Sequence, residues 1–539
     1  MTNANDNAAG AGTDFDAIVV GAGFAGMYML HRLRGQGMRV RVLEAGSSVG
    51  GTWYWNRYPG ARVDTETMFY SYQFSSELEQ EWEWTERYPS QQELHAYARH
   101  VADRFGLWPD IQFESPVVKS TWSENRQNWT VETADGTCLT ARYCVMATGC
   151  LSAVNTPSYK GLEDFSGSVY HTARWPEDGV DFSGLRVAVI GTGSSGVQSI
   201  PVIAEQAKHL TVFQRTGNYV IPAHNRALDP EEVAEVKANY PSLRAKARAS
   251  FSGNYFPVGG PSAMAVSEDE RNREYESRWQ EGGLAFMAAY ADFMTSEEAN
   301  ETASEFIRNK IRGIVKDPAM AELLAPKQLF MCKRLCVGTD YYETYNRDNV
   351  TLVDVSETVI DEILPEGIRV GETVYDVDAI VLATGFDAMT GALKRIDIRG
   401  VDNASLRDLW EDGPRAYLGL AISKFPNLFM ITGPGSPSVL TNMIPSIEQH
   451  VDWITDCLAD MRARGMSRIE PEPDAQEAWV AHVNEIADLS MRSTCSSWYL
   501  GSNVDGKPRV FMPYIGGFPA YVRKCEEVVE AGYAGFSFR

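Results

Sequence analysis

The hydrophobic and polar positions of the chain repeat one pattern twice. An apolar run at residues 15–20 leads into a glycine-rich turn, a segment with helical spacing and a second apolar strand that ends at Glu44. A second copy starts at residues 186–190 and ends in the strand at residues 209–215. Strand, helix and parallel strand in this order are typical of a dinucleotide-binding unit. The pattern therefore predicts an α/β protein with two Rossmann-like dinucleotide-binding domains.

The two glycine-rich turns match the dinucleotide fingerprint G-x-G-x-x-G. Glycine permits the tight turn and the close approach of pyrophosphate, and the helix that follows offers unpaired N–H groups to the phosphates. Because each copy follows an apolar strand and opens a helix, the pair is far more specific than one motif alone. The residues are Gly21, Gly23 and Gly26 in the first turn, and Gly191, Gly193, Ser194, Ser195 and Gly196 in the second.

The residue that ends the second strand of each copy predicts the nucleotide. Glu44 stands where a carboxylate accepts hydrogen bonds from the ribose hydroxyls, which favours FAD or NAD in the first unit. The second copy has Gln214 there, followed by Arg215. A neutral residue and a cation suit a 2′-phosphate that a carboxylate would repel, so we expect NADPH in the second unit.

Domain boundaries follow from length and from two strands that end alike. At 539 residues the chain is too long for one core. The apolar strands at 143–149 and 379–387 both finish in Ala-Thr-Gly, where we expect the chain to cross between domains. Helix-capping signals at Asp229–Pro230, Ser267–Glu270 and Thr295–Glu298 mark a helical region between them. We predict an FAD domain at 1–150 and 386–539, an NADP domain at 151–225 and 331–385, and a helical insertion at 226–330.

Composition narrows the possible partners. With 49 Lys and Arg against 72 Asp and Glu, the net charge is −23, which repels nucleic acid and anionic membranes. No segment approaches the roughly 18 apolar residues of a transmembrane helix. The polar, acidic start of the chain lacks the features of a secretory signal, so we expect a cytoplasmic location. These patterns leave the oligomeric state open.

The eight cysteines indicate neither a zinc site nor a disulfide framework, because no CxxC pair occurs. We expect reduced thiols and no metal. The closest pair, Cys332 and Cys336, suggests redox chemistry only weakly, because spacing without context is a poor guide.

Two further segments are candidates for chemistry. Residues 50–64 are rich in aromatic residues and glycine, and they leave the first unit where a loop can reach across a flavin. A packed surface loop is the alternative, because aromatic residues often only bury area. Residues 331–335 hold Lys333 beside Arg334, either as an exposed pair or as groups that face the 2′-phosphate and the flavin.

The segment at 165–176, FSGSVYHTARWP, resembles the F-x-G-x-x-x-H-x-x-x-W-P fingerprint of the Baeyer-Villiger monooxygenases. Similarity also covers residues 50–64, CKRL, ATGFDAMTG, GPGSPSVLTNM at 433–443 and SWYLGSN at 497–503, and is strongest to the phenylacetone and steroid monooxygenase subgroup. The matching positions of the fingerprint are Phe165, Gly167, His171, Trp175 and Pro176. The resemblance implies that this segment is a hinge or latch between the nucleotide domains, with His171 bonded to backbone and not acting as acid or base.

The resemblance implies that NADPH reduces FAD, that O2 adds at flavin C4a, and that the anionic peroxyflavin attacks a ketone to give an ester or lactone. Arg334 would keep the peroxide deprotonated, and Asp64 would position Arg334. Lys333, Arg215 and Thr216 would hold the 2′-phosphate, and Trp498 would close over the nicotinamide. Further cofactor contacts are expected at Thr52, Trp53, Trp55, Asp64 and Tyr70, and substrate contacts at Val439, Leu440 and Met443.

Other functions remain as alternatives. An N- or S-oxygenating class B flavin monooxygenase shares both glycine-rich turns, although the twelve-residue fingerprint and the Lys333–Arg334 pair favour the Baeyer-Villiger reaction. A flavin disulfide reductase would need two neighbouring redox cysteines after Gly50 and Gly51, and none occur there. A non-enzymatic redox sensor would bind both cofactors without consuming NADPH in response to ketones. The sequence does not single out an aromatic, cyclic, linear or steroid ketone.

Overall fold

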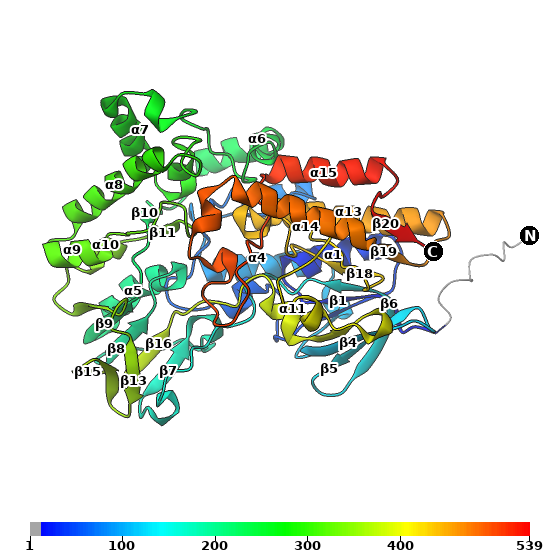
Figure 1. Cartoon of the computed structure of the whole chain (residues 1–539), viewed down its shortest axis with the longest axis horizontal. Coiled ribbons are helices and arrows are strands. Elements are labelled where there is room, and N and C mark those ends of the chain that lie inside the picture. Colours follow the sequence, from blue (N-terminus) through cyan, green and yellow to red (C-terminus); the bar gives the residue numbers. More distant parts are fainter. Residues whose placement is uncertain (1–11) are drawn as a thin grey trace, which may run out of the picture.

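The computed structural model describes residues 12–539, and its two largest sheets both contain parallel strands (Figure 1). The start of the chain, on which the absence of a secretory signal was argued, lies largely outside the described residues. No helix within residues 12–539 combines the length and the apolar character that crossing a membrane requires. The α/β class predicted from the repeated pattern is confirmed.

The first sheet has eight strands and is built around β1 (Phe15–Val20). Parallel neighbours β2 (Val40–Leu43) and β6 (Cys138–Met146) pair with the two edges of β1, and the apolar run from Ala17 to Val20 is buried. The chain returns to this sheet late, where β18 (Leu428–Met430) pairs with β6. The other members are β3 (Ile111–Gln112), β4 (Val117–Ser123), β5 (Asn128–Thr133) and β17 (Asp397–Arg399).

Helix α1 (Phe24–Gly35) follows β1 and packs against α13 (Met443–Ala463). Both helices are buried along most of their length, as helices are when neighbours cover them on several sides. This contact places residues 443–463 beside the helix that follows the first glycine-rich turn.

The second sheet has the order β12-β9-β8-β16-β7. Its strands are β7 (Ser168–His171), β8 (Arg186–Ile190), β9 (His209–Gln214), β12 (Val350–Asp354) and β16 (Ala379–Leu382). Sequence analysis predicts a connecting hinge at 165–176, whereas residues 168–171 form an edge strand of this sheet. The difference arises because this short segment alternates too little to show its pairing with the apolar strand β16.

Four helices form most of the region between β10 and β11: α6 (Pro230–Arg248), α7 (Glu268–Glu281), α8 (Glu297–Ile314) and α9 (Pro318–Leu324). In Figure 1 they lie above the second sheet. Asp229 and Ser267 cap α6 and α7 as predicted. The predicted cap Thr295 is wrong, because its hydroxyl donates to the Asp292 carbonyl while Ser296 accepts from the N–H of Ala299.

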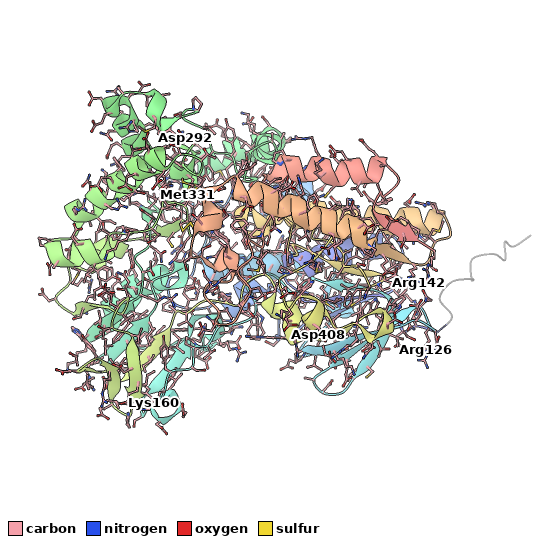
Figure 2. All side chains as sticks on the ribbon, viewed as in Figure 1. Arg126, Arg142, Lys160, Asp292, Met331 and Asp408 are labelled. Atoms are coloured by element: carbon pink, nitrogen blue, oxygen red, sulfur yellow. A yellow bond between two sulfur atoms is a disulfide. The ribbon has the colours of Figure 1, made fainter. Side chains whose placement is uncertain are left out.

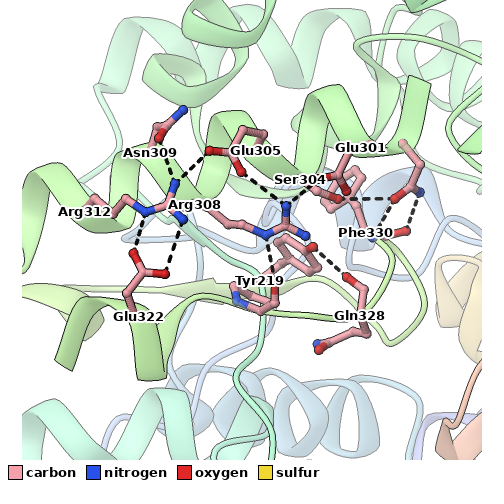
Figure 3. Close-up of polar contacts among 12 residues, drawn as sticks. Tyr219, Glu301, Ser304, Glu305, Arg308, Asn309, Arg312, Glu322, Gln328 and Phe330 are labelled. Carbon is pink, nitrogen blue, oxygen red and sulfur yellow. Dashed lines mark hydrogen bonds and ion pairs between the residues drawn. The ribbon is translucent and has the colours of Figure 1, made fainter. Parts of the chain in front are cut away.

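Polar contacts of α8 fix the segment that leads to Lys333 and Arg334 (Figure 3). The Asn300 amide donates to the Phe330 carbonyl at 2.9 Å and accepts from the Phe330 N–H at 2.9 Å. Arg308 donates to the carbonyl of Pro326 at 2.9 Å. The helical region therefore positions the chain just ahead of the predicted catalytic arginine.

The remaining elements complete the fold. The helices are α2 (Thr52–Trp55), α3 (Ser76–Glu81), α4 (Gln91–Arg104), α10 (Tyr341–Thr344), α11 (Gly391–Arg395), α12 (Leu406–Leu409), α14 (Pro473–Asp488) and α15 (Phe518–Glu530). The strands are β10 (Val220–Pro222), β11 (Cys336–Gly338), β13 (Ile360–Leu364), β14 (Gly367–Val370), β15 (Thr373–Asp376), β19 (Ile469–Pro471) and β20 (Phe536–Phe538).

Candidate active site

The backbone of each glycine-rich turn leaves no room for a side chain at its first and last glycine. Gly21 has a φ of +104°, and a Cβ on Gly26 would lie 1.8 Å from the Gly21 carbonyl oxygen. Gly191 has a φ of +108°, and a Cβ on Gly196 would lie 2.2 Å from the Gly191 carbonyl oxygen. Glycine is therefore required at these positions by the fold itself.

The middle glycines have a different role. A Cβ on Gly193 would meet no protein atom within 4 Å, so packing within the protein does not require glycine there. A glycine at this position fits the close approach of a pyrophosphate. Gly23 and Gly193 begin α1 and α5 (Ser194–Gln206) without a side-chain cap, and neither first turn holds an acidic residue. Ser194 and Ser195 lie in the first turn of α5. Both helix starts thus fit the phosphates of a dinucleotide.

Glu44 is buried at the end of β2, with one carboxylate oxygen 2.6 Å from the Ala22 N–H and the other 2.8 Å from the Gly46 N–H. Burial raises the pKa of Glu44, and these backbone donors counter that effect. The carboxylate therefore lies beside the first turn, at the point where we expect the ribose.

The aromatic loop at 50–64 begins against the first turn, because a Cβ on Gly51 would lie 2.8 Å from the Cα of Gly23. It then forms the short helix α2, in which Trp53 is buried and donates to the Tyr70 hydroxyl at 3.1 Å. Thr52 and Trp55 are exposed. The loop is therefore not simply a packed surface loop, because its start contacts the first glycine-rich turn and Trp53 is buried.

The second turn is accompanied by a pair of cations. Gln214 is buried and donates to the Leu323 carbonyl at 2.7 Å, whereas Arg215 is exposed at the end of β9. Burial lowers the pKa of Lys333, and the charge of nearby Arg215 lowers it further. Thr216 follows Arg215, and its carbonyl accepts from the Thr192 hydroxyl at 3.1 Å. Two cations close together fit a doubly charged phosphate.

Arg334 joins three segments that the sequence places far apart. Its Nε and one terminal nitrogen donate to the two oxygens of Asp64, at 2.6 and 2.8 Å. The other terminal nitrogen donates to the Val439 carbonyl at 2.7 Å. Burial alone would lower the pKa of Arg334, but the charge of Asp64 and its hydrogen bonds outweigh burial and raise that pKa. The guanidinium is therefore held in place and stays charged.

Trp498 and the predicted substrate residues meet near this pair. Val439 and Tyr499 belong to one buried apolar cluster, against which Leu440, Met443 and Trp498 pack. The structure therefore brings together Trp498 and the three substrate residues that the resemblance predicted.

A contact that sequence reasoning missed holds the loop after Trp498. Lys507 lies 2.6 Å from a carboxylate oxygen of Asp387 and 2.7 Å from the carbonyl of Ala388. Asn503 donates to the Phe386 carbonyl at 2.7 Å. Only the resemblance of the ATGFDAMTG segment could have drawn attention to Asp387.

His171 of the fingerprint connects both points where the chain crosses between the sheets. Its Nδ1 accepts from the Ala173 N–H at 3.0 Å, and its Nε2 lies 3.3 Å from the Asn155 carbonyl and 3.1 Å from the Thr384 hydroxyl. Burial lowers the pKa of His171, which favours the neutral ring. These bonds agree with the expected role of His171 as a residue bonded to backbone.

The expectation of reduced thiols is wrong for one pair, because Cys332 and Cys495 form a disulfide with Cα atoms 5.6 Å apart. The partners are 163 residues apart in sequence, so spacing gives no sign of the pairing. Cys336, the weakly suggested partner of Cys332, is a buried free thiol 3.5 Å from the Ser194 hydroxyl. The disulfide ties the Arg334 segment to the segment that precedes Trp498.

We predict that Cys495→Ser lowers the unfolding free energy by about 2–4 kcal/mol, because the disulfide restricts a long loop of the unfolded chain. Thermal unfolding should show a lower melting temperature for the variant. A reducing agent should lower that of the wild type and leave the variant unchanged. The matched control is Cys138→Ser, which alters an exposed free cysteine. A wild type that is insensitive to reduction would contradict the prediction.

Comparison with known proteins agrees with this geometry. The family described as pyridine nucleotide-disulphide oxidoreductase matches residues 18–248. A Baeyer-Villiger monooxygenase of Pseudooceanicola batsensis is 44% identical over 99% of this chain and 98% of its own length. A phenazine N-monooxygenase of Lysobacter antibioticus is 42% identical over 97% of each chain. The solved structure of an oxidized steroid monooxygenase bound to NADP is 52% identical, covers 97% of this chain and 99% of its own, and has a TM-score of 0.93. This chain belongs to the Baeyer-Villiger monooxygenase family.

Proposed function

We propose that this protein is an FAD-containing enzyme that uses NADPH and O2 to convert ketones to esters or lactones. The observation that carries the proposal is the guanidinium of Arg334, held by both oxygens of Asp64 and by the Val439 carbonyl. The same chain offers two helix starts without side-chain caps and an apolar loop that contains Val439, whose carbonyl Arg334 contacts.

The residues present fit both cofactors. The first turn, Glu44 and the loop at 50–64 would hold FAD, and the second turn with Arg215 and Lys333 would hold NADPH. When bound, FAD supplies the redox chemistry that carries electrons from NADPH to O2. The division into an FAD domain at 1–150 and 386–539, an NADP domain at 151–225 and 331–385 and an insertion at 226–330 is part of this proposal.

Arg334 acts on oxygen atoms that carry negative charge during the reaction. A guanidinium has five N–H donors, and Asp64 and Val439 engage three nitrogens through one bond each. One N–H on each terminal nitrogen therefore stays available to a reacting oxygen. Because arginine does not lose its proton at working pH, it stabilises a negative oxygen without neutralising it. Asp64 is a positioning residue that fixes the guanidinium and offsets the cost of burying its charge.

The apolar residues around Arg334 would form the binding site for the ketone. Val439, Leu440 and Met443 would contact the ketone, and Trp498 would exclude water above the nicotinamide. The Lys507–Asp387 ion pair holds the loop of Trp498 in place. A ketone and O2 are the proposed reaction partners, and we expect a cytoplasmic location with no nucleic acid or membrane partner.

The test is a panel of aromatic, cyclic, linear and steroid ketones, with NADPH loss followed by absorbance and products identified by mass. We expect at least one ketone to stimulate NADPH loss and to yield a product heavier by one oxygen. A panel that leaves NADPH loss unchanged and yields no ester would refute the proposal.

N- or S-oxygenation is a second candidate, favoured by the close similarity to a phenazine N-monooxygenase. An amine or sulfide attacks an electrophilic oxygen itself and does not need a guanidinium that preserves a negative one. Amines and sulfides therefore belong in the same panel, and their oxygenation should survive the loss of Arg334.

A further inference from the structure

Arg492 is a cation that has no counter-ion among residues 12–539. It lies in a short helical turn, Met491–Thr494, where its N–H donates to the Ser490 hydroxyl. Its Nε donates to the carbonyl of Met331 at 3.1 Å; Figure 2 labels Met331 between the helical region and the C-terminal segment. Across residues 12–539, no carboxylate lies within ion-pair distance of Arg492, and its terminal nitrogens have no hydrogen-bond acceptor.

Two connections place Arg492 beside the Arg334 segment. Its bond to Met331 holds it three residues ahead of Arg334 along the chain. The Cys332–Cys495 disulfide fixes the same two segments together. The positive charge of Arg334 contributes, after burial, to a lowered pKa of Arg492, which agrees with their closeness.

Arg334 and Arg492 differ in what neutralises them. Arg334 has Asp64, whereas Arg492 has only a neutral carbonyl. A partly buried guanidinium without an anionic partner is costly. Arg492 is only partly buried, and within residues 12–539 its terminal nitrogens make no hydrogen bond. An anion brought by a ligand would supply the missing partner.

The nucleotide phosphates are less suitable than the substrate as this anion. Arg215 and Lys333 already form a cation pair, and the start of α5 offers the second phosphate site. Arg492 lies beside the Arg334 segment, and Arg334 in turn donates to the carbonyl of Val439 in the predicted substrate loop.

We infer that Arg492 binds a carboxylate of the substrate, so that the enzyme prefers ketones that carry a carboxylate over neutral ketones of the same shape. A guanidinium binds a carboxylate through two parallel hydrogen bonds, and the two terminal nitrogens of Arg492 are free to make them. This inference rests on the proposed function, because it concerns selectivity among ketones.

The experiment compares kcat/KM for each of two acids with that for its methyl ester: levulinate, and phenylacetone with a para-carboxyl group. The acid and the ester differ in charge but share the ketone. We expect the wild type to favour at least one acid, and Arg492→Met to lower that acid-to-ester ratio about tenfold or more while the ester rate stays unchanged. Arg492→Lys should keep part of the preference, because it retains the charge without the planar fork.

Arg126→Met is the matched control, because it removes an exposed arginine that makes no ion pair among residues 12–539 and is labelled far from Met331 in Figure 2. This variant should keep the wild-type ratio. An unchanged acid-to-ester ratio of kcat/KM in Arg492→Met would overturn the inference. A KM for NADPH that rises equally with the acid and with the ester would also overturn it, because Arg492 would then act on the nucleotide. Failure of the wild type to oxygenate even the esters would instead refute the proposed function.

Discussion

Arg334→Ala is expected to abolish ester formation while NADPH still reduces the flavin at nearly the wild-type rate. In the proposed function the guanidinium stabilises negative oxygen, and removing one such donor typically costs about 100-fold to 1,000-fold in rate. In the same proposal, reduction of the flavin depends on the two glycine-rich turns and on Arg215 and Lys333, all of which this change leaves in place. Anaerobic stopped-flow absorbance measures reduction, and mass spectrometry measures the ester.

The control for this experiment is Arg334→Lys, which keeps a positive charge but lacks the planar fork that spaces the bonds to Asp64 and to the Val439 carbonyl. We expect it to form ester slowly, between the wild type and Arg334→Ala. Flavin absorbance of each purified variant checks that FAD is still bound. Ester formation by Arg334→Ala at the wild-type rate would show that Arg334 is not the catalytic group.

Arg215→Ala is expected to raise the KM for NADPH by roughly 10-fold to 100-fold and to leave the KM for NADH nearly unchanged. The reason is that a hydrogen bond to a charged group contributes about 1.5–3 kcal/mol, and only NADPH has the 2′-phosphate that makes one. Steady-state kinetics with both nucleotides at a saturating ketone concentration measures the effect.

Lys333→Ala should shift the same preference in the same direction, since Lys333 lies close enough to Arg215 for the two charges to interact. Arg347→Ala, which alters an exposed arginine with no ion pair within residues 12–539, is the matched control for a lost surface charge. Equal changes for NADPH and NADH in Arg215→Ala would count against a 2′-phosphate site.

The repeated strand, turn and helix could be predicted because its signals are local. Residues 186–190 form β8, and the helix predicted after Gly193 is α5. The glycine spacing marks a backbone that only glycine can adopt, so the positions of Gly21 and Gly191 follow from chemistry that the sequence displays. Resemblance then supplied Asp64 and Arg334, which the structure brings within hydrogen-bond distance.

The features that could not be predicted all depend on contacts between distant segments. Cys332 and Cys495 pair across a separation that no spacing rule covers. The strand at 168–171 is recognised only when β16 is beside it. Whether Thr295 or Ser296 caps a helix depends on backbone angles at a single residue, and the Lys507–Asp387 ion pair depends on how the C-terminal loop folds back.

The most direct test of the proposed function is the mass of the ester that the wild-type enzyme forms from a ketone, NADPH and oxygen-18 gas in ordinary water. The proposal predicts that the ester carries one labelled oxygen atom and that about one NADPH is consumed per ester. An unlabelled product, or NADPH consumption that produces no ester with any ketone of the panel, would contradict it.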